Sequence, residues 1–198
     1  MKRDFCLLGI LCCAYAFSAP PPNAYSYVSN QPGCRADTSA DQELVINGDG
    51  EQWVIVAPAR VVSTGRHQTV HELAKAPLDL EIAEPLALAL QNRLARSQST
   101  VQGEDRPSKI TRIKIVSVWH GVLGLGMGQA VGKIEVRFNI CINGNLPEGK
   151  VPNEVARNSP KMSTLWHQPR GEELRHGFQQ AADEAFSAIA DLALRPID

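Results

Sequence analysis

The chain has 198 residues, and its 20 basic and 21 acidic side chains leave a formal net charge of −1 at pH 7. This length is enough for one domain with a sizeable apolar core. The balanced charge excludes the basic stripe of a nucleic-acid-binding protein and the polybasic patch that draws a protein to an anionic membrane.

The first residues have the layout of a secretory signal peptide. Two basic residues follow Met1, an apolar run covers residues 5–16, and small residues come next. The run has about twelve residues, whereas a membrane-spanning helix needs roughly 20. We therefore predict a signal peptide over residues 1–18, cleaved after Ser18. Cleavage after Ala16 and a buried N-terminal helix are the alternative interpretations.

Cysteine usage agrees with export. Three of the five cysteines lie in the predicted signal peptide, so the mature chain keeps Cys34 and Cys141. Two cysteines in an oxidising compartment predict a disulfide, which here would close a long loop of the chain. Two unpaired thiols are the alternative interpretation.

Cys13 is a candidate lipidation site at the end of the apolar run. Lipidation favours a small residue directly before the cysteine and a branched apolar residue three positions before it. Cys12 and Ile10 hold these two positions here. A lipid on Cys13 would anchor the protein to a membrane rather than leave it free.

A flexible polar tail is predicted over residues 19–43. Its sequence, "APPPNAYSYVSNQPGCRADTSADQE", is rich in Pro, Ser, Ala, Asn and Asp and has almost no aliphatic residues. Such a segment cannot bury enough apolar surface to fold alone, although a bond at Cys34 would tie it down. Residues 44–198 contain neither an internal repeat nor a second boundary, so we predict a single domain there.

The domain is predicted to open with a hairpin and a helix. Two apolar runs, 44–46 and 53–56, flank "NGDG", which is a strong hairpin turn signal and lacks the spacing of a calcium loop. A helix is predicted over 83–96, because Pro85 suits its first turn and leucines recur on one face. These leucines are Leu86, Leu90 and Leu94.

Two strands are predicted next, over 109–123 and 132–144. In "GKIEVRFNICING" the apolar residues alternate with polar ones, which indicates a half-buried strand of an antiparallel sheet. This alternation places Cys141 on the polar face. A Cys34–Cys141 bond would therefore carry the N-terminal tail across the outer face of the sheet.

The C-terminal part is predicted to be irregular and then helical. Residues 144–170 hold four prolines, so we expect a loop there with at most one short edge strand. Residues 171–194 have helical periodicity, with Glu172 and Glu173 in the first turn, where the helix dipole favours acidic side chains. The predicted fold is α+β, an antiparallel sheet with two amphipathic helices packed on one face.

Glycines cluster at 124, 126, 128 and 132, between the two long predicted strands. A phosphate-binding loop requires a helix after it, and here a strand follows, so no nucleotide is expected. One interpretation is a hairpin that glycine allows to twist or bulge. The other is an apolar hairpin tip that contacts a membrane or a protein partner. The candidate contact residues are Val122, Leu123, Leu125 and Met127.

A search for catalytic patterns finds none. His67 and His71 are four residues apart, as two ligands on one helix face would be, but Lys75 stands where the zincin pattern requires a second histidine. No G-x-S-x-G motif occurs. We therefore predict a protein that is not an enzyme and needs neither a cofactor nor a metal. His67 and His71 are interpreted as exposed polar residues, and metal ligation by this pair is the alternative interpretation.

Four segments resemble small envelope lipoproteins of the YajG-like and transporter-auxiliary types. "EPLALALQNRLARS" is similar to their first helix, "ITRIKIVSVWHGVL" and "AVGKIEVRFNICING" to their central hairpin, and "EELRHGFQQAADEAFSAIADLAL" to their closing helix. The resemblance implies a non-catalytic protein on the periplasmic side of an outer membrane that acts through contacts.

The sequence thus predicts an exported, non-enzymatic protein of a bacterial envelope. It would lie in the periplasm, at the outer membrane, or be secreted, and would bind an envelope protein or a membrane component. The alternative functions are a secreted inhibitor of a foreign enzyme and a metal-dependent hydrolase that uses the two histidines.

Overall fold

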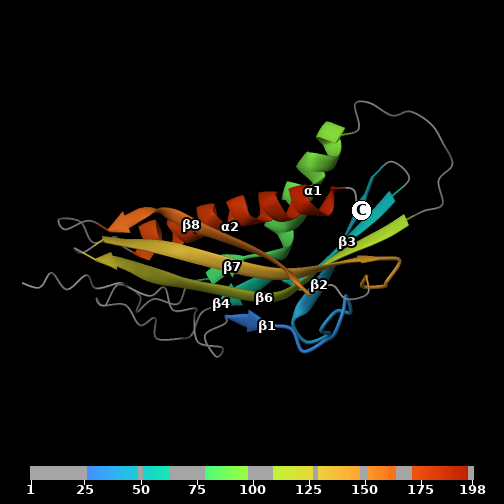
Figure 1. The fold of residues 1–198 in the computed structure, drawn as a ribbon, viewed down its shortest axis with the longest axis horizontal. Helices are drawn as coiled ribbons and strands as arrows, with labels where there is room; N and C mark the ends of the chain where they lie inside the picture. Colours follow the sequence, from blue (N-terminus) through green and yellow to red (C-terminus); the bar gives the residue numbers. More distant parts are fainter. Residues whose placement is uncertain are drawn as a thin grey trace, which may run out of the picture.

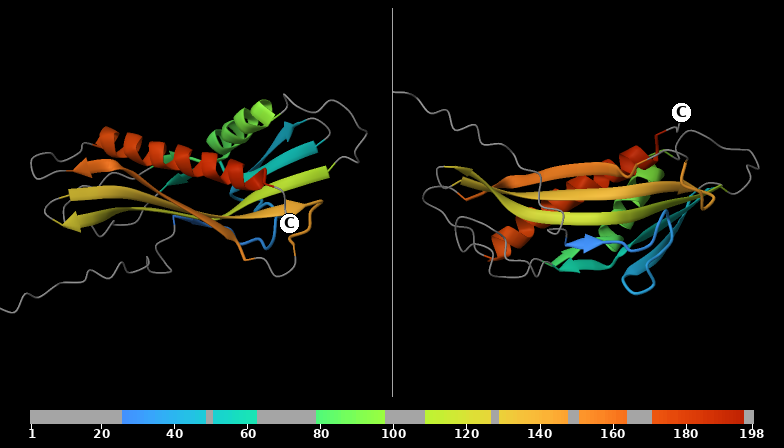
Figure 2. Two further views of the ribbon diagram at one scale, coloured as in Figure 1. Left: turned by 45° about the horizontal axis from the view of Figure 1, so that its top comes forward. Right: turned by 60° about the horizontal axis from the view of Figure 1, so that its bottom comes forward.

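Two helices cover one face of a six-stranded sheet, and β4 and β5 form a separate two-stranded sheet (Figure 1, Figure 2). This architecture confirms the predicted α+β class. The computed structural model describes residues 26–48, 51–62, 79–97, 109–126, 129–147, 151–163 and 171–195.

The described elements carry the labels of Figure 1. In chain order they are β1 (Tyr27–Val28), β2 (Asp41–Asn47), β3 (Glu51–Pro58), β4 (Arg60–Val62), β5 (Asp79–Glu81), α1 (Ala83–Ser97), β6 (Lys109–Gly126), β7 (Gln129–Ile142), β8 (Asn153–Ser163) and α2 (Gly171–Ala193).

The strand order in the large sheet is β2-β3-β6-β7-β8, and β1 pairs with β6. Every pair is antiparallel except β3 and β6, which run parallel. The chain passes through β4, β5 and α1 between these two strands, and a parallel neighbour requires such a crossover. The sheet is therefore mixed, whereas the sequence pattern indicated antiparallel pairing alone.

The first hairpin forms where the turn signal predicted it. β2 and β3 pair up to Asn47, the first residue of "NGDG", and Gln52. β2 begins at Asp41, three residues before the apolar run over 44–46. The pattern missed this extension because the added residues are polar and belong to an edge strand.

Both helices match their predicted ranges closely. α1 has Glu84 in its first turn and Arg96 in its last, as the helix dipole favours, and α2 begins with Glu172 and Glu173. Neither helix among the described residues is long and apolar enough to cross a membrane.

The apolar core lies between the helices and the sheet face that they cover, which we call the inner face. β6 and β7 supply it through alternate residues, interrupted by a bulge in β6 between Ile115 and Ser117. The fully buried members from strands and helices include Ile55, Ile113, Ile115, Ile134, Val136, Phe138, Leu86, Leu90, Phe178, Phe186 and Ile189.

The prediction for residues 144–170 is wrong in one respect. β8 is an 11-residue strand that pairs with β7 from Asn153 to Ser163, so it is not short. Its proline, Pro160, lies within a register shift of an edge strand, a position that tolerates a residue without an N–H. The turn predicted after β7 is present: Asn143 and Gly144 have φ angles of 50° and 81°.

Candidate functional site

An N-terminal segment crosses the face of the sheet opposite the helices, which we call the outer face. We name this segment, residues 26–40, the strap. Its strand β1 pairs with β6 at Tyr27 and Val118, beyond Lys114, where the pairing of β3 with β6 ends (Figure 2). Part of the predicted polar tail therefore has a defined place on the sheet.

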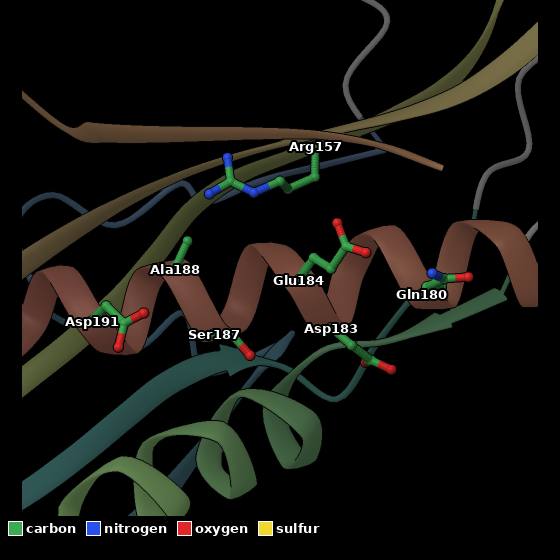
Figure 3. A pocket seen from close by; sticks show the side chains of 7 residues that line it. All are labelled: Arg157, Gln180, Asp183, Glu184, Ser187, Ala188 and Asp191. Atoms are coloured by element: carbon green, nitrogen blue, oxygen red, sulfur yellow. The ribbon is translucent and has the colours of Figure 1, made fainter. Parts of the chain in front are cut away.

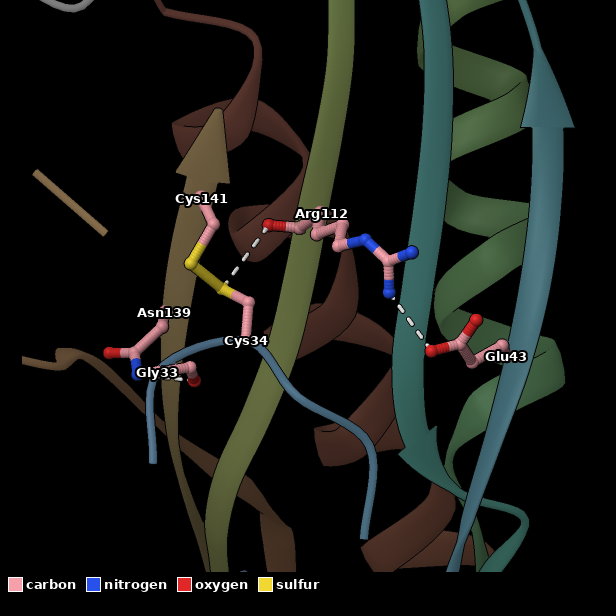
Figure 4. The surroundings of a disulfide bond; sticks show 6 residues. All are labelled: Gly33, Cys34, Glu43, Arg112, Asn139 and Cys141. Atoms are coloured by element: carbon pink, nitrogen blue, oxygen red, sulfur yellow. Dashed lines mark hydrogen bonds and ion pairs between the residues drawn. A yellow bond between two sulfur atoms is a disulfide. The ribbon is translucent and has the colours of Figure 1, made fainter. Parts of the chain in front are cut away.

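A disulfide joins the strap to β7. Cys34 and Cys141 are bonded across 107 residues of sequence, with their Cα atoms 6.2 Å apart (Figure 4). Beside the bond, the Asn139 side chain donates a hydrogen bond of 3.0 Å to the carbonyl of Gly33. The bond that the cysteine count predicted is present, and it lies on the outer face as the alternation of β7 indicated.

A buried ion pair lies under the strap. Lys114 of β6 pairs with the carboxylate of Asp41 of β2, and neither side chain is exposed to solvent. The carboxylate also accepts the Tyr27 hydroxyl at 2.5 Å and the backbone N–H of Asp37 at 2.6 Å. A buried ion pair is tolerated only when further hydrogen bonds satisfy its charges, and the strap supplies two of them.

Two ionisable side chains of the strap, Tyr27 and Asp37, have shifted pKa values in this cluster. Burial, and then the hydrogen bond to Asp41, raise the pKa of the Tyr27 hydroxyl far above its usual range, so it remains a donor. Hydrogen bonds from the Ser39 hydroxyl and from the backbone N–H of Asn30 lower the pKa of Asp37. Because Lys114 and Asp41 are enclosed, their role in this arrangement is to hold the strap rather than to meet a substrate.

The glycine at position 121 has a packing explanation. A Cβ on Gly121 would lie 2.6 Å from the Trp119 ring, so the indole closely approaches the glycine. On the neighbouring strand, the Lys133 ammonium is 6.0 Å from the centroid of that ring. Glycine is needed here for the close approach of an aromatic side chain.

Gly124, Gly126 and Gly132 lie toward the end of the β6–β7 hairpin. The two strands remain paired as far as Gly126 and Gln129, with a register shift between Gly124 and Gly126 (Figure 1). This strand-turn-strand arrangement is the hairpin that the first interpretation predicted. Of the candidate contact residues, Val122, Leu123 and Leu125 lie on this last part of β6, and Met127 lies outside the described residues.

The remaining predicted sites lie outside the described residues. They are the signal peptide with Cys13, and the candidate metal ligands His67 and His71. Within the ranges that the structure describes, no group of three or more His, Cys, Asp or Glu side chains could hold a metal ion. His120, which no pattern had singled out, is buried on the inner face with its ring centroid 5.7 Å from that of Phe178.

A shallow groove of about 430 Å³ runs along α2 beside β8; Glu184 points toward Arg157, whereas Asp183 and Ser187 point to the other side of the helix (Figure 3). Arg157 enters it from β8, and its guanidinium donates to the carbonyl of Ala156 at 2.8 Å. The helix side carries three carboxylates, of which Asp191 is paired with Arg93 of α1. The α2 residues that line the groove are Gln180, Asp183, Glu184, Ser187, Ala188 and Asp191.

Sequence reasoning missed this groove because it did not predict β8 at full length. The helix-side residues Gln180, Glu184, Ala188 and Asp191 follow one another at spacings of four, four and three along α2. That spacing marks one flank of a helix. The spacing was visible in the sequence and could have indicated a mostly polar side of α2. The groove also requires β8 beside that side, and β8 was not predicted at full length.

No protein-family model matches this sequence, and no curated protein matches it. Among solved structures, a minor lipoprotein from Acinetobacter baumannii is similar, with 14% identity over 57% of this chain and 83% of its own, at a TM-score of 0.37. A Caulobacter crescentus CB15 protein, provisionally described as a lipoprotein, has 18% identity over 56% and 80%, at a TM-score of 0.30. Likeness of this degree carries no information about activity or partner.

Proposed function

We propose that this chain is an exported, non-enzymatic protein of a bacterial envelope that acts by binding another envelope component. The Cys34–Cys141 bond is the observation that carries the proposal. Disulfides of this kind persist in oxidising compartments and are rare in the cytosol. The signal-peptide pattern over residues 1–18, on the N-terminal side of the strap, supports the same compartment.

We place the contact with the partner at the end of the β6–β7 hairpin. The paired strands hold this end at a fixed position relative to the core, since they continue as far as Gly126 and Gln129. The sequence there interleaves glycines with four apolar residues at positions 122, 123, 125 and 127. Apolar residues gathered on a projecting element are typical of a protein or membrane contact.

Export is tested by expressing the full chain in a Gram-negative host and measuring its intact mass in each cell fraction. We expect a chain cleaved near Ser18 whose mass rises by two hydrogens on reduction. A mass that corresponds to a chain beginning at Cys13 with acyl groups would show that the protein is a membrane-anchored lipoprotein. A full-length cytosolic chain with free thiols would contradict the proposal.

Binding is tested by site-specific photo-crosslinking from position 124 in cells. The triple variant Leu123→Ser, Leu125→Ser, Met127→Ser should lose the adduct formed by a probe at position 124 while keeping its unfolding midpoint. Leu88→Ser is the matched control, because Leu88 is an exposed apolar residue of α1, 57% exposed, and far in sequence from the hairpin. An adduct that survives the triple variant would refute the hairpin as the contact surface.

A further inference from the structure

The N-terminal chain joins the sheet from the side of the β6–β7 hairpin end. β1 runs antiparallel to β6, with Tyr27 opposite Val118, so the beginning of β1 points along β6 toward Gly126 (Figure 1). The amide of Ser26, with which the described chain begins, donates to the carbonyl of Val118. Residues 1–18, the part of the sequence predicted to meet a membrane, therefore connect to the fold from the hairpin side.

The sequence of the hairpin end carries no ionisable side chain. Residues 121–132, "GVLGLGMGQAVG", contain no Asp, Glu, Lys, Arg or His. Strands of the sheet continue into this end, because Ala130 of β7 pairs with Gly124 of β6 on one side and with Ser163 of β8 on the other. Transfer of this end from water to a lipid interface therefore requires no charged group to lose its hydration.

The opposite end of β6 is charged. Lys109 lies 3.9 Å from the carboxylate of Glu51, and Arg112 lies 2.9 Å from that of Glu43. All four side chains are partly exposed to water. Removing such ion pairs from water costs free energy that their mutual attraction often does not offset. Between the two ends of β6, the hairpin end is the one that can meet a lipid surface without dehydrating an ion pair.

Backbone pairing limits the depth of such a contact. From Trp119 onward, the edge of β6 that faces away from β7 has no strand partner within the described ranges. An unpaired sheet edge is not tolerated in the hydrocarbon core, whereas the interfacial layer, about 5–10 Å deep, supplies hydrogen-bond partners. At roughly 3.3 Å per residue, this layer takes about two or three residue pairs. Leu123 with Val131 and Gly124 with Ala130 are such pairs.

A lysine lies at the base of the uncharged end on each of two neighbouring strands. Lys133 follows this end directly on β7, and Lys161 of β8 pairs with Val131. The Lys133 ammonium is 3.4 Å from the carboxylate of Glu135, which offsets its charge. Two lysines are too few to draw the chain to a membrane alone. They add a preference for anionic lipid to a contact that is mainly apolar.

We propose that the partner of the hairpin end is a lipid surface: this end enters the interfacial layer of a phospholipid bilayer, and Lys161 lies near the phosphates. The inference rests on the proposed function and names the chemistry of the component that the hairpin contacts. An acylated chain that begins at Cys13 and a chain cleaved after Ser18 would present the same end of the sheet to the lipid.

The principal test is flotation of the purified mature chain with vesicles of phosphatidylethanolamine and phosphatidylglycerol, with which the wild type should float. Leu123→Ser with Leu125→Ser should lower the partition coefficient about tenfold, because less apolar area leaves water. Val45→Ser with Leu88→Ser is the matched control, since these residues are 55% and 57% exposed on β2 and α1, and it should leave binding unchanged. A wild type that does not float, or equal losses in both variants, would overturn the proposal.

A fluorescent probe reports the orientation while both hairpin leucines are kept. A polarity-sensitive dye on Gly124→Cys should shift to shorter wavelengths with vesicles and be quenched by lipids that carry a quencher. The same dye on Asn47→Cys, an exposed site at the opposite end of the sheet, should show neither change. The dye reacts with the added thiol, because Cys34 and Cys141 are bonded. An equal response at both positions would refute the orientation.

One further substitution tests the place of Lys161. The wild type should bind about fivefold more weakly when phosphatidylcholine replaces phosphatidylglycerol in the vesicles, and Lys161→Gln should lose most of this difference. Lys109→Gln is the matched control, because Lys109 begins β6 at the opposite end of the sheet. Equal effects of the two substitutions would refute the contact of Lys161 with lipid phosphates.

The outcomes separate this inference from the proposed function. If the chain ignores vesicles but a probe at position 124 forms a protein adduct in cells, the inference fails and the proposed function stands. If the purified chain floats but the expressed chain stays full-length in the cytosol, the proposed function fails and the affinity of the hairpin for lipid remains. Dimers in sedimentation that the double leucine variant abolishes would overturn the inference in favour of a second copy.

Discussion

The two faces of the large sheet are buried by different means. On β6, Ile113 and Ile115 point to the inner face and Lys114 to the outer face, and all three are fully buried. The isoleucines belong to the apolar cluster under α1 and α2. Lys114 is covered by the strap and is paired with Asp41. Burial of a residue therefore says little about the interaction that keeps it there.

This difference decides how each face responds to change. Inner-face stability is a sum of many apolar contacts, each of which depends on area and packing. Outer-face stability depends on one covalent bond and a small set of hydrogen bonds to Asp41 and Asp37. The inner face should lose stability gradually as residues are changed, and the outer face should lose it in large steps.

The largest step is expected from the disulfide. Cys34→Ser with Cys141→Ser should lower the free energy of unfolding by about 4 to 5 kcal/mol, because the bond closes a loop of roughly a hundred residues. In the wild-type chain the backbone amides of Ser26 and Ser29 donate to the carbonyls of Val118 and Val116, at 2.9 and 2.8 Å. They should lose protection against hydrogen exchange before the amides of α2 do.

Denaturant titration with and without reductant provides the control. Reductant should lower the midpoint of the wild-type chain and leave the double variant unchanged. An unchanged free energy of unfolding in the variant, or simultaneous loss of protection in the strap and α2, would remove the distinction between the two faces.

Neighbouring substitutions on β6 sharpen the comparison. Lys114→Met should cost about 3 to 5 kcal/mol, because it leaves the buried Asp41 carboxylate without its cation. Ile115→Val, one residue away on the inner face, should cost about 0.5 to 1.5 kcal/mol through the loss of one methylene group. Equilibrium unfolding of both variants measures the two losses of unfolding free energy, and the loss for Lys114→Met should be several times the larger.

A rescue variant shows whether charge is the cause. Lys114→Met combined with Asp41→Asn should be more stable than Lys114→Met alone, because no unpaired charge remains and the amide oxygen still accepts from Tyr27. If the double variant is no more stable, lost packing around the lysine stem explains the cost instead.

Much of the inner face could be predicted from the sequence, although the parallel β3–β6 pairing and the length of β8 could not. Both helices, the β2–β3 hairpin and the alternation of β7 follow from apolar periodicity, since each buries one apolar face. The outer face could not, because Lys114 and Asp41 are residues that a pattern assigns to solvent. The strap has no apolar periodicity, and its place was indicated only by the two cysteines together with the alternation that puts Cys141 on the outer face.

The candidate surfaces were predictable to different degrees. The hairpin end was visible as glycines between two strand patterns, and the structure pairs those strands to Gly126. The β8 edge was hidden by Pro152 and Pro160, which suggested a loop. Proline is compatible with an edge strand, so its presence should lower the expectation of a central strand only.

A smaller effect is expected from Tyr27, which contacts the outer-face cluster at its rim. Tyr27→Phe removes the hydroxyl that donates to Asp41 and should cost about 1.5 to 3 kcal/mol, as expected for a hydrogen bond to a charged group. Chemical denaturation at pH 7 measures this loss. Stability equal to that of the wild type would mean that Lys114 and the Asp37 amide satisfy the carboxylate without the strap tyrosine.

The smallest effect is a change in pH dependence from Asp37→Asn. Hydrogen bonds from Ser39 and Asn30 lower the pKa of Asp37 in the folded chain below its unfolded value. A lowered folded pKa stabilises the protein above the unfolded value of about 3.9, and this stabilisation disappears as the pH falls below it. The variant should therefore be less stable than the wild type near neutral pH, and the difference should shrink below about pH 4. Ser39→Ala removes the principal donor and should produce the same convergence. A difference that stays constant with pH would show that Asp37 holds the strap through its shape rather than its charge.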